Sequence, residues 1–186
     1  MQRHVVPAVY LSLLLLAITG VSRAAEPASA LCQSSALPAD IQQSLGKYFQ
    51  GWKIQDPASL TPDMAAHWQA EAPNTCPGIM SGHFESKRRI DYMLLMIDPS
   101  TQGYRLVAFR EQTAGLYGFK VLELAASGGA SRFLRALSPA MRASASLPES
   151  REGVVLVSSD SRGLIAMFYY WNNDDFMRQQ VPYPSG

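Results

Sequence analysis

The stretch that decides the fold class is DYMLLMI, residues 91–97. Its hydrophobic side chains are consecutive rather than alternating, which is typical of a strand that is buried on both faces. A turn cluster follows at 98–103, and alternating hydrophobic residues then run through 104–109 and again through 117–121. This order predicts an antiparallel meander of three strands.

A second meander is predicted in the C-terminal part of the chain. Its three strands are indicated at 154–157, 164–171 and 176–183, with short polar turns between them. Small residues break the pattern at 126–130, and the hydrophobic residues within 132–141 predict a short helix. The second meander is therefore separated from the first by a break and a helix.

Two helices are predicted before the strands. The first begins at Pro38 and ends at Gly51, because hydrophobic residues recur between them at helical spacing. The second begins at Thr61 and places Met64 and Trp68 on one apolar face. Helices followed by mostly antiparallel strands define an α+β fold. We expect the helices to cover one face of the sheet, or to close one side of a small propeller-like or barrel-like sheet.

Residues 1–24 have the pattern of a bacterial secretory signal peptide. A short positive segment precedes a leucine-rich run from Val9 to Ile18, and the small residues Ser22 and Ala24 then form a cleavage site. The hydrophobic run is too short for an anchor, since crossing a bilayer takes about 20 apolar residues. The pattern predicts cleavage after Ala24 and a periplasmic or secreted protein.

The mature chain of about 160 residues predicts one domain, 37–186, preceded by a small polar tail, 25–36. Hydrophobic residues make up 47% of the sequence and charged residues 17%, which is typical of a globular protein. The net charge of +1, without a broad basic field, argues against a nucleic-acid partner. No second hydrophobic stretch reaches spanning length, so the mature chain is not expected to cross a membrane.

The chain has 2 cysteines, Cys32 and Cys76, and both follow the predicted cleavage site. Because an exported protein meets an oxidising environment, a Cys32–Cys76 disulfide is the expected state. The alternative is a catalytic Cys76, with His83 as its base and Asp91 as the residue that orients the base. Cys76 lies in a Thr-Cys-Pro-Gly turn and has an available partner, which favours the disulfide.

The segment 82–95, GHFESKRRIDYMLL, resembles the motif of FG-GAP-like secreted proteins, in which Gly-Asp-Phe, an acidic loop and Asp-Tyr precede an apolar strand. The matching positions are Gly82, Phe84, Asp91 and Tyr92. His83 replaces the aspartate of the motif, and ESKRR at 85–89 replaces its calcium loop. Calcium needs about 6–8 oxygen ligands, so the resemblance implies a strand–turn–strand and the cations argue against the metal.

The later segment 169–176, YYWNNDDF, is similar to the closing hairpin of small bacterial exported proteins that carry one such motif. Some proteins of that kind bind and inhibit cell-wall hydrolases. The resemblance implies an envelope or secreted protein as partner, and a non-catalytic inhibitor or immunity-type function. No cofactor is predicted.

The same hairpin supplies the predicted binding residues, because an aromatic strand leads into a polar turn and rigid hairpins commonly present binding loops. These residues are Tyr170, Trp171, Asn172, Asn173, Asp174 and Asp175. Alternation places Trp171 and Tyr169 on one face of the strand and Tyr170 on the other. Two roles stay open for Trp171, a core residue or an interface anchor.

Two other functions also stay open. A small secreted hydrolase would assemble its site from distant residues, and His83, Asp91 and Glu85 are the candidates. A pocket that converges on His83 would favour this hypothesis. The third possibility is an accessory subunit of an envelope complex. A zinc site at His67 and His83 is not favoured, because the sequence shows no further ligands near them.

Overall fold

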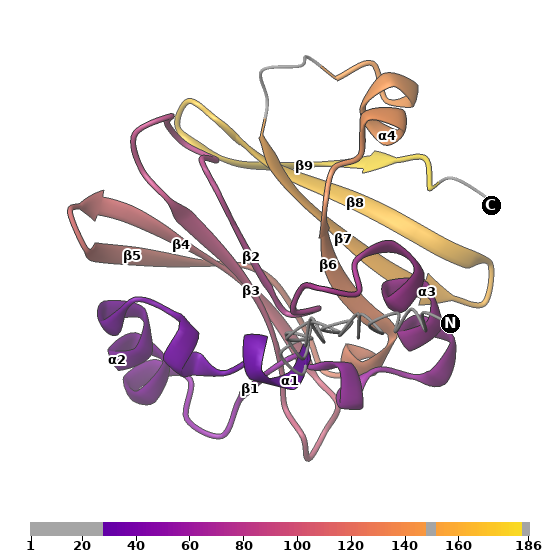
Figure 1. The fold of residues 1–186 in the computed structure, drawn as a ribbon, viewed down its shortest axis with the longest axis horizontal. Coiled ribbons are helices and arrows are strands. Elements are labelled where there is room, and N and C mark those ends of the chain that lie inside the picture. The colour runs from indigo at the N-terminus through magenta and orange to yellow at the C-terminus, as the bar shows by residue number, and fades with distance from the viewer. Residues whose placement is uncertain (1–27, 148–151, 184–186) are drawn as a thin grey trace, which may run out of the picture.

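Two antiparallel sheets form the fold, which confirms the α+β prediction (Figure 1). The computed structural model describes residues 28–147 and 152–183, so the predicted signal peptide lies outside the described residues. The first sheet contains β1 (Lys53–Ile54), β2 (Ile79–Gly82), β3 (Asp91–Ile97), β4 (Tyr104–Thr113) and β5 (Leu116–Ala125). The second contains β6 (Arg132–Ala136), β7 (Gly153–Asp160), β8 (Gly163–Asn172) and β9 (Asp175–Val181).

The α-helices are α1 (Ala28–Leu31), α2 (Ala39–Tyr48), α3 (Pro62–Glu71) and α4 (Pro139–Ser144). Three short 3-10 turns accompany them, η1 (Ser34–Ala36), η2 (Pro57–Ser59) and η3 (Gly129–Ser131). Helices α2 and α3 lie where the sequence predicts helices. In the described part of the chain, no helix is long and apolar enough to cross a membrane.

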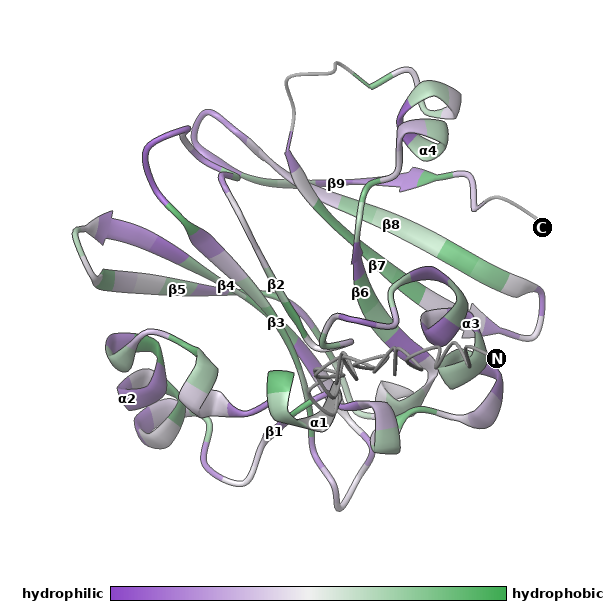
Figure 2. Ribbon diagram, viewed as in Figure 1, coloured by the Kyte–Doolittle hydropathy of each residue, from purple (hydrophilic) through white to green (hydrophobic). Residues whose placement is uncertain are grey.

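The two sheets pack face to face through one shared hydrophobic layer. Met93 and Leu95 of β3 contribute to this layer from the first sheet, and Leu134 of β6 and Leu156 of β7 contribute from the second. Hydrophobic colour runs along β3 and β7 through the middle of the molecule (Figure 2). Burial of this apolar area is the main source of stability for such a fold.

The helices cover the outer faces of the two sheets, so the layers run α2, first sheet, second sheet, then α3 with α4. Leu94 and Met96 of β3 point toward α2, while their neighbours point between the sheets. This explains the consecutive hydrophobic residues of 91–97. The expectation that both helices share one face is wrong, because α2 packs on the first sheet and α3 on the second.

Both predicted three-strand meanders are present, as β3-β4-β5 and β7-β8-β9, and each sheet also has strands that the sequence did not indicate as part of a meander. The first sheet runs β1-β3-β4-β5 with β2 also paired to β3, and the second runs β6-β7-β8-β9. Over the described residues neither sheet closes into a barrel. The propeller-like and barrel-like alternatives are therefore replaced by a sandwich of two open sheets.

The helix predicted within 132–141 is the other difference. Residues Arg132–Ala136 form strand β6, and helix α4 begins only at Pro139, where the Ser138 hydroxyl accepts from the Met141 N–H at 3.2 Å. Phe133 faces α3 while Leu134 faces the first sheet. Both sides of β6 are buried, and short apolar runs of this kind are compatible with helix and strand alike.

The predicted Cys32–Cys76 disulfide is present, with a Cα–Cα distance of 5.1 Å. It holds the N-terminal segment, which contains α1 and η1, against the turn before β2. That turn also joins the sheets. The Leu95 N–H donates to the Gly78 carbonyl at 2.9 Å, and the Leu134 N–H donates to the Pro77 carbonyl at 2.7 Å. A Cβ at Gly78 would lie 2.5 Å from the Gln55 carbonyl oxygen, so only glycine fits there.

One polar cluster lies at the edge of the layer between the sheets. The hydroxyls of Tyr104 and Tyr169 each donate to one carboxylate oxygen of Glu123. Burial raises the pKa of Tyr104 to about 12, and its hydrogen bond to Glu123 acts in the same direction. Burial and the Glu123 hydrogen bond also raise the pKa of Tyr169. The cluster therefore links β4, β5 and β8 across the two sheets.

This cluster predicts a loss of stability in alkaline solution. A tyrosine whose pKa is raised by folding stabilises the folded state fully below its unfolded pKa of 10.0. That contribution is lost as the pH rises through the folded pKa, so Tyr104 should account for on the order of 2 kcal/mol between about pH 10 and about pH 12. Urea denaturation across this range measures it. Tyr104→Phe should show a shallower decline, and equal slopes in the two proteins would contradict the assignment.

Candidate protein-binding surface

The two segments singled out by the sequence meet at one end of the molecule. The loop between β2 and β3 lies beside the turn between β8 and β9 (Figure 1). Arg110 of β4 joins them. Its Nε and Nη2 donate to the two carboxylate oxygens of Glu85 at 3.0 and 2.7 Å, and its guanidinium lies 3.8 Å from the centroid of the Trp171 ring. One arginine thus ties the first sheet's loop to the aromatic strand of the second sheet.

Asp91 fixes the loop that carries Glu85. Its buried carboxylate accepts the backbone N–H of Glu85 at 3.0 Å and the backbone N–H of Glu111 at 3.1 Å. Burial raises the pKa of the Asp91 carboxyl, and these two hydrogen bonds partly oppose the shift. Asp91 therefore organises the backbone of the loop between β2 and β3.

Trp171 is half-buried, so it is neither a core residue nor a free surface residue. Phe176 packs edge-on against its ring at a centroid distance of 5.2 Å, and its indole N–H donates to the Asn173 carbonyl at 3.2 Å. With Arg110 over one part of the ring, the indole is held in one orientation. A rigid, partly exposed tryptophan has the properties of an interface anchor.

The turn beyond Trp171 has the predicted hairpin geometry. Asn172 pairs with Asp175, and Asn173 adopts a left-handed backbone with φ of 60°. Asp175 forms an ion pair with Lys120 of β5 at 2.5 Å, and this interaction lowers the pKa of the Asp175 carboxyl. Both partners are about half exposed, so the pair orients the turn and contributes little stability.

A shallow depression of about 400 Å³ opens beside Trp171. Its lining residues are Glu85, Ser86, Arg88, Arg89, Trp171 and Asn173. Arg89 Nη1 donates to the Glu111 carbonyl at 3.3 Å. Among the described residues the Arg88 guanidinium forms no ion pair, and its side chain is exposed. The surface therefore offers an aromatic ring, a carboxylate that is already paired, and a free cation.

Of the remaining predicted binding residues, Tyr170 lies elsewhere and Asp174 is exposed at the turn. Tyr170 stacks on Phe168 with a centroid distance of 5.3 Å, beside the hydrophobic cluster under α3. The structure thus groups Trp171 and Asn173 with the loop between β2 and β3, and places Tyr170 on the opposite face of β8.

The residues proposed for a hydrolase each hold a different partner. His83 is exposed, its Nδ1 lies 2.8 Å from the Arg89 carbonyl oxygen, and its backbone N–H donates to Glu152 at 2.9 Å. Glu85 pairs with Arg110 and Asp91 holds backbone amides, as described above. Cys76 is in the disulfide and has no free thiol. His67 lies on α3 with its ring edge-on to Tyr183 at 6.4 Å.

Within the described residues, no group of three or more His, Cys, Asp or Glu side chains could hold a metal ion. The sequence signal for the site was incomplete, because Arg110 appears only as one more charged residue near the end of a strand. Its role depends on a loop and a hairpin that are far from it in sequence.

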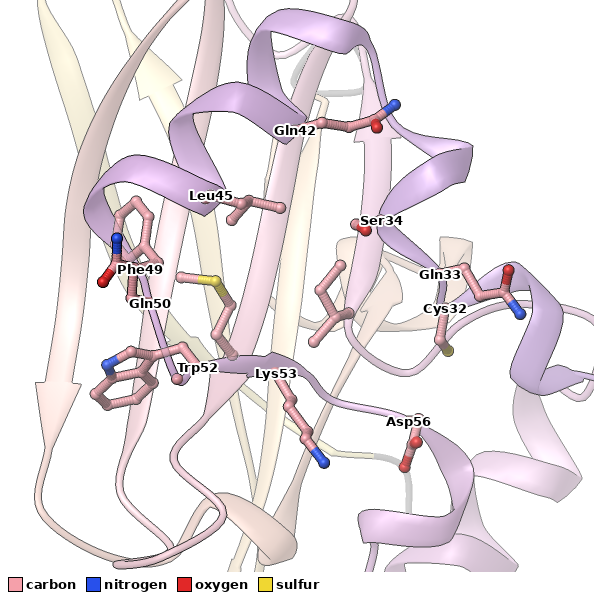
Figure 3. Close-up of a pocket in the computed structure, with 14 residues that line it drawn as sticks. Cys32, Gln33, Ser34, Gln42, Leu45, Phe49, Gln50, Trp52, Lys53 and Asp56 are labelled. Carbon is pink, nitrogen blue, oxygen red and sulfur yellow. The ribbon is translucent and has the colours of Figure 1, made fainter.

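A second and larger hollow of about 640 Å³ lies between α2 and the segment around β1 (Figure 3). Its apolar lining includes Leu45, Phe49 and Met96, and its charged lining residues are Lys53 and Asp56. Several of its polar groups serve local structure. Asp56 Oδ1, for example, accepts the backbone N–H of Ser59 at 2.8 Å and caps η2. The Trp171 surface joins separate elements instead, and it is the better candidate for recognition.

Comparison with known proteins adds no relative, because no family model, no curated protein and no solved structure matches this chain.

Proposed function

We propose that this chain is a bacterial exported protein-binding domain that acts in the periplasm or outside the cell as an inhibitor or immunity-type protein. The observation that carries the proposal is the stack of Glu85, Arg110 and Trp171, which presents a rigid indole next to the exposed Arg88. Tryptophan and arginine are the residues most enriched among interface residues that dominate binding energy.

Three further features fit an envelope location. The signal pattern of residues 1–24 supports export, and the Cys32–Cys76 disulfide is stable in an oxidising compartment. Ile90 is a large, exposed hydrophobic residue in the loop between β2 and β3. The backbone N–H of Ile90 donates to the Glu111 carboxylate, and the Glu111 N–H donates to Asp91, so Ile90 belongs to the hydrogen-bond network that holds this loop. The partner is a protein of the envelope or the medium, and a cell-wall hydrolase is the first to test.

Replacing Trp171 with alanine tests the proposal. Binding to the partner should weaken by about 2 kcal/mol or more, because a central anchor is lost. The free energy of unfolding should fall by only about 1–2 kcal/mol, since the ring is half-buried, whereas a core tryptophan would cost about 3–5 kcal/mol. Affinity capture from envelope extract, followed by a peptidoglycan-lysis assay with a lysozyme-type hydrolase, measures binding and inhibition. Urea denaturation measures stability.

Trp52 provides the matched control. It is also half-buried beneath an arginine, with Arg105 4.2 Å from its ring centroid, but it lies at the groove of Figure 3. Trp52→Ala should leave binding unchanged, and Arg88→Ala should weaken binding without a change in stability. If Trp171→Ala and Arg88→Ala both retained every wild-type partner and the wild-type inhibition, this surface would not be the contact site.

A further inference from the structure

Strand β5 leaves most of one edge without a partner, since only the Tyr117 N–H near its start is held, by the Asp40 carboxylate of α2 at 2.7 Å. It is a ten-residue strand at the end of the first sheet, hydrogen-bonded to β4 on one side. No strand in the described residues pairs with its other side. Edge strands expose unpaired N–H and C=O groups that can accept a further strand, and natural proteins usually protect them with charges, prolines or bulges.

The free edge of β5 is unusually hydrophobic. Most of the exposed large hydrophobic residues of the described chain lie on it or against it: Leu116 (56% exposed), Phe119 (39%), Val121 (40%), Leu124 (62%) and Tyr48 at the end of α2 (51%). Tyr48 contacts Phe119 with a centroid distance of 5.3 Å. The patch therefore continues from the strand onto the helix, and an isolated molecule would leave it in water.

The edge of the second sheet provides the contrast. Strand β9 is also an edge strand, but Arg178, Gln179 and Gln180 are its exposed side chains next to Met177. Polar side chains of this kind are the usual protection of an edge. Of these two edges, the β5 edge is the one that combines free backbone groups with a row of apolar side chains.

The side chains of β5 divide cleanly between its two faces. Tyr117, Phe119 and Val121 lie opposite Glu111, Phe109 and Val107 of β4, on the face that α2 partly covers. Gly118 and Lys120 lie opposite Arg110 and Ala108, on the face toward the second sheet. Lys120 is already paired with Asp175 there.

These positions fit a second copy of the same strand. We propose that β5 pairs with β5 of a second copy, antiparallel, with Phe119 on the two-fold axis. Tyr117 then faces Val121 of the other copy and forms a continuous hydrophobic strip with the two Phe119 rings. The Asp40 carboxylate, which accepts the Tyr117 N–H at 2.7 Å, has to turn away from the edge for this pairing. Lys120 faces Gly118, which has no side chain, so the register avoids a repulsive lysine pair. The two first sheets become one sheet across the dimer, and the inference is independent of the proposed function.

Sedimentation of the mature protein, residues 25–186, over a range of concentrations tests the dimer. Wild type should sediment as a dimer, and Val121→Lys should be monomeric because two buried lysines would face the hydrophobic strip. Ile90→Lys in the loop between β2 and β3 is the matched control and should remain dimeric, since Ile90 is similarly exposed at 45%. Thermal melts confirm that each variant is folded. A wild-type protein that is monomeric at every concentration would overturn the proposal.

Cysteine crosslinking tests the register. Residue 119 is on the axis, so Phe119→Cys should give a disulfide-linked dimer on a non-reducing gel. Val121→Cys should not, because its two copies are separated by four positions along the strands, about 13 Å. The double variant Tyr117→Cys/Val121→Cys should also form a disulfide-linked dimer. It replaces Phe119→Cys as the test if that variant does not fold. Crosslinking of Val121→Cys alone, or of none of the three, would contradict this register and the proposal with it.

Discussion

Replacing both Cys32 and Cys76 with alanine is expected to lower the free energy of unfolding by about 4 kcal/mol. The disulfide closes a loop with a sequence separation of 44 residues, and its removal returns the corresponding conformational freedom to the unfolded chain. Domains of this size are stable by only about 5–15 kcal/mol, so the double variant should be close to unfolding at growth temperature. Urea denaturation of a purified chain of residues 25–186 measures the change.

Reduction of the wild-type protein is the control for this experiment. Reduced wild type and the double variant should lose similar amounts of stability, because the effect comes from the link rather than from the sulfur atoms. A loss below about 1 kcal/mol in both would show that the N-terminal segment contributes little to the folded state. The expected effect is large because the segment that holds α1 and η1 is fastened to the turn that joins the two sheets.

Asp91→Ala is expected to cost about 2–5 kcal/mol of stability and to abolish binding at the Trp171 surface. The substitution leaves the partly buried N–H groups of Glu85 and Glu111 without this acceptor, and a buried group without a partner costs about 1–3 kcal/mol. The loop that positions Glu85, and through it Arg110, loses its support. Urea denaturation and affinity capture measure the two effects separately.

Asp63→Ala is the control for Asp91→Ala. Asp63 is an exposed residue in the first turn of α3, where a carboxylate interacts with the helix dipole, and its loss should cost below about 1 kcal/mol. Asp91→Asn keeps one oxygen acceptor, so its loss of stability should lie between those of Asp91→Ala and Asp63→Ala. If Asp91→Ala were as stable as Asp63→Ala, the loop would be held by contacts other than the buried carboxylate.

Much of the fold could be predicted because buried positions are occupied by hydrophobic residues, and their spacing is visible in the sequence. The residues of 91–97 alternate between the layer under α2 and the layer between the sheets, so both faces are hydrophobic and the strand is unmistakable. Strand β6 could not be predicted, because Phe133 and Leu134 are adjacent and buried on opposite sides. Two neighbouring hydrophobic residues in a five-residue strand contain too little periodicity to distinguish it from a helix.

The site was predictable only in part. Local sequence identified the loop at 82–91 and the hairpin at 169–176, because turns and aromatic strands are local features. Their contact depends on how two sheets pack, and Arg110 shows no sequence signal of that packing. The sequence also could not decide whether Trp171 is a core residue or an interface anchor. Its indole is half-buried under an arginine, which is intermediate between a core side chain and a free surface side chain.

The position of α3 makes the chain slow to complete its core during synthesis. Met64 and Trp68 leave the ribosome early, yet they are covered by Phe133, Val155 and Phe168, which follow much later in the chain. At a usual rate of translation, roughly ten seconds pass between the synthesis of the helix and the synthesis of the strands that cover it. A chain released at the end of β5 would keep this helix and the inner face of the first sheet uncovered. The apolar face of α3 therefore stays uncovered until the strands of the second sheet have been synthesised.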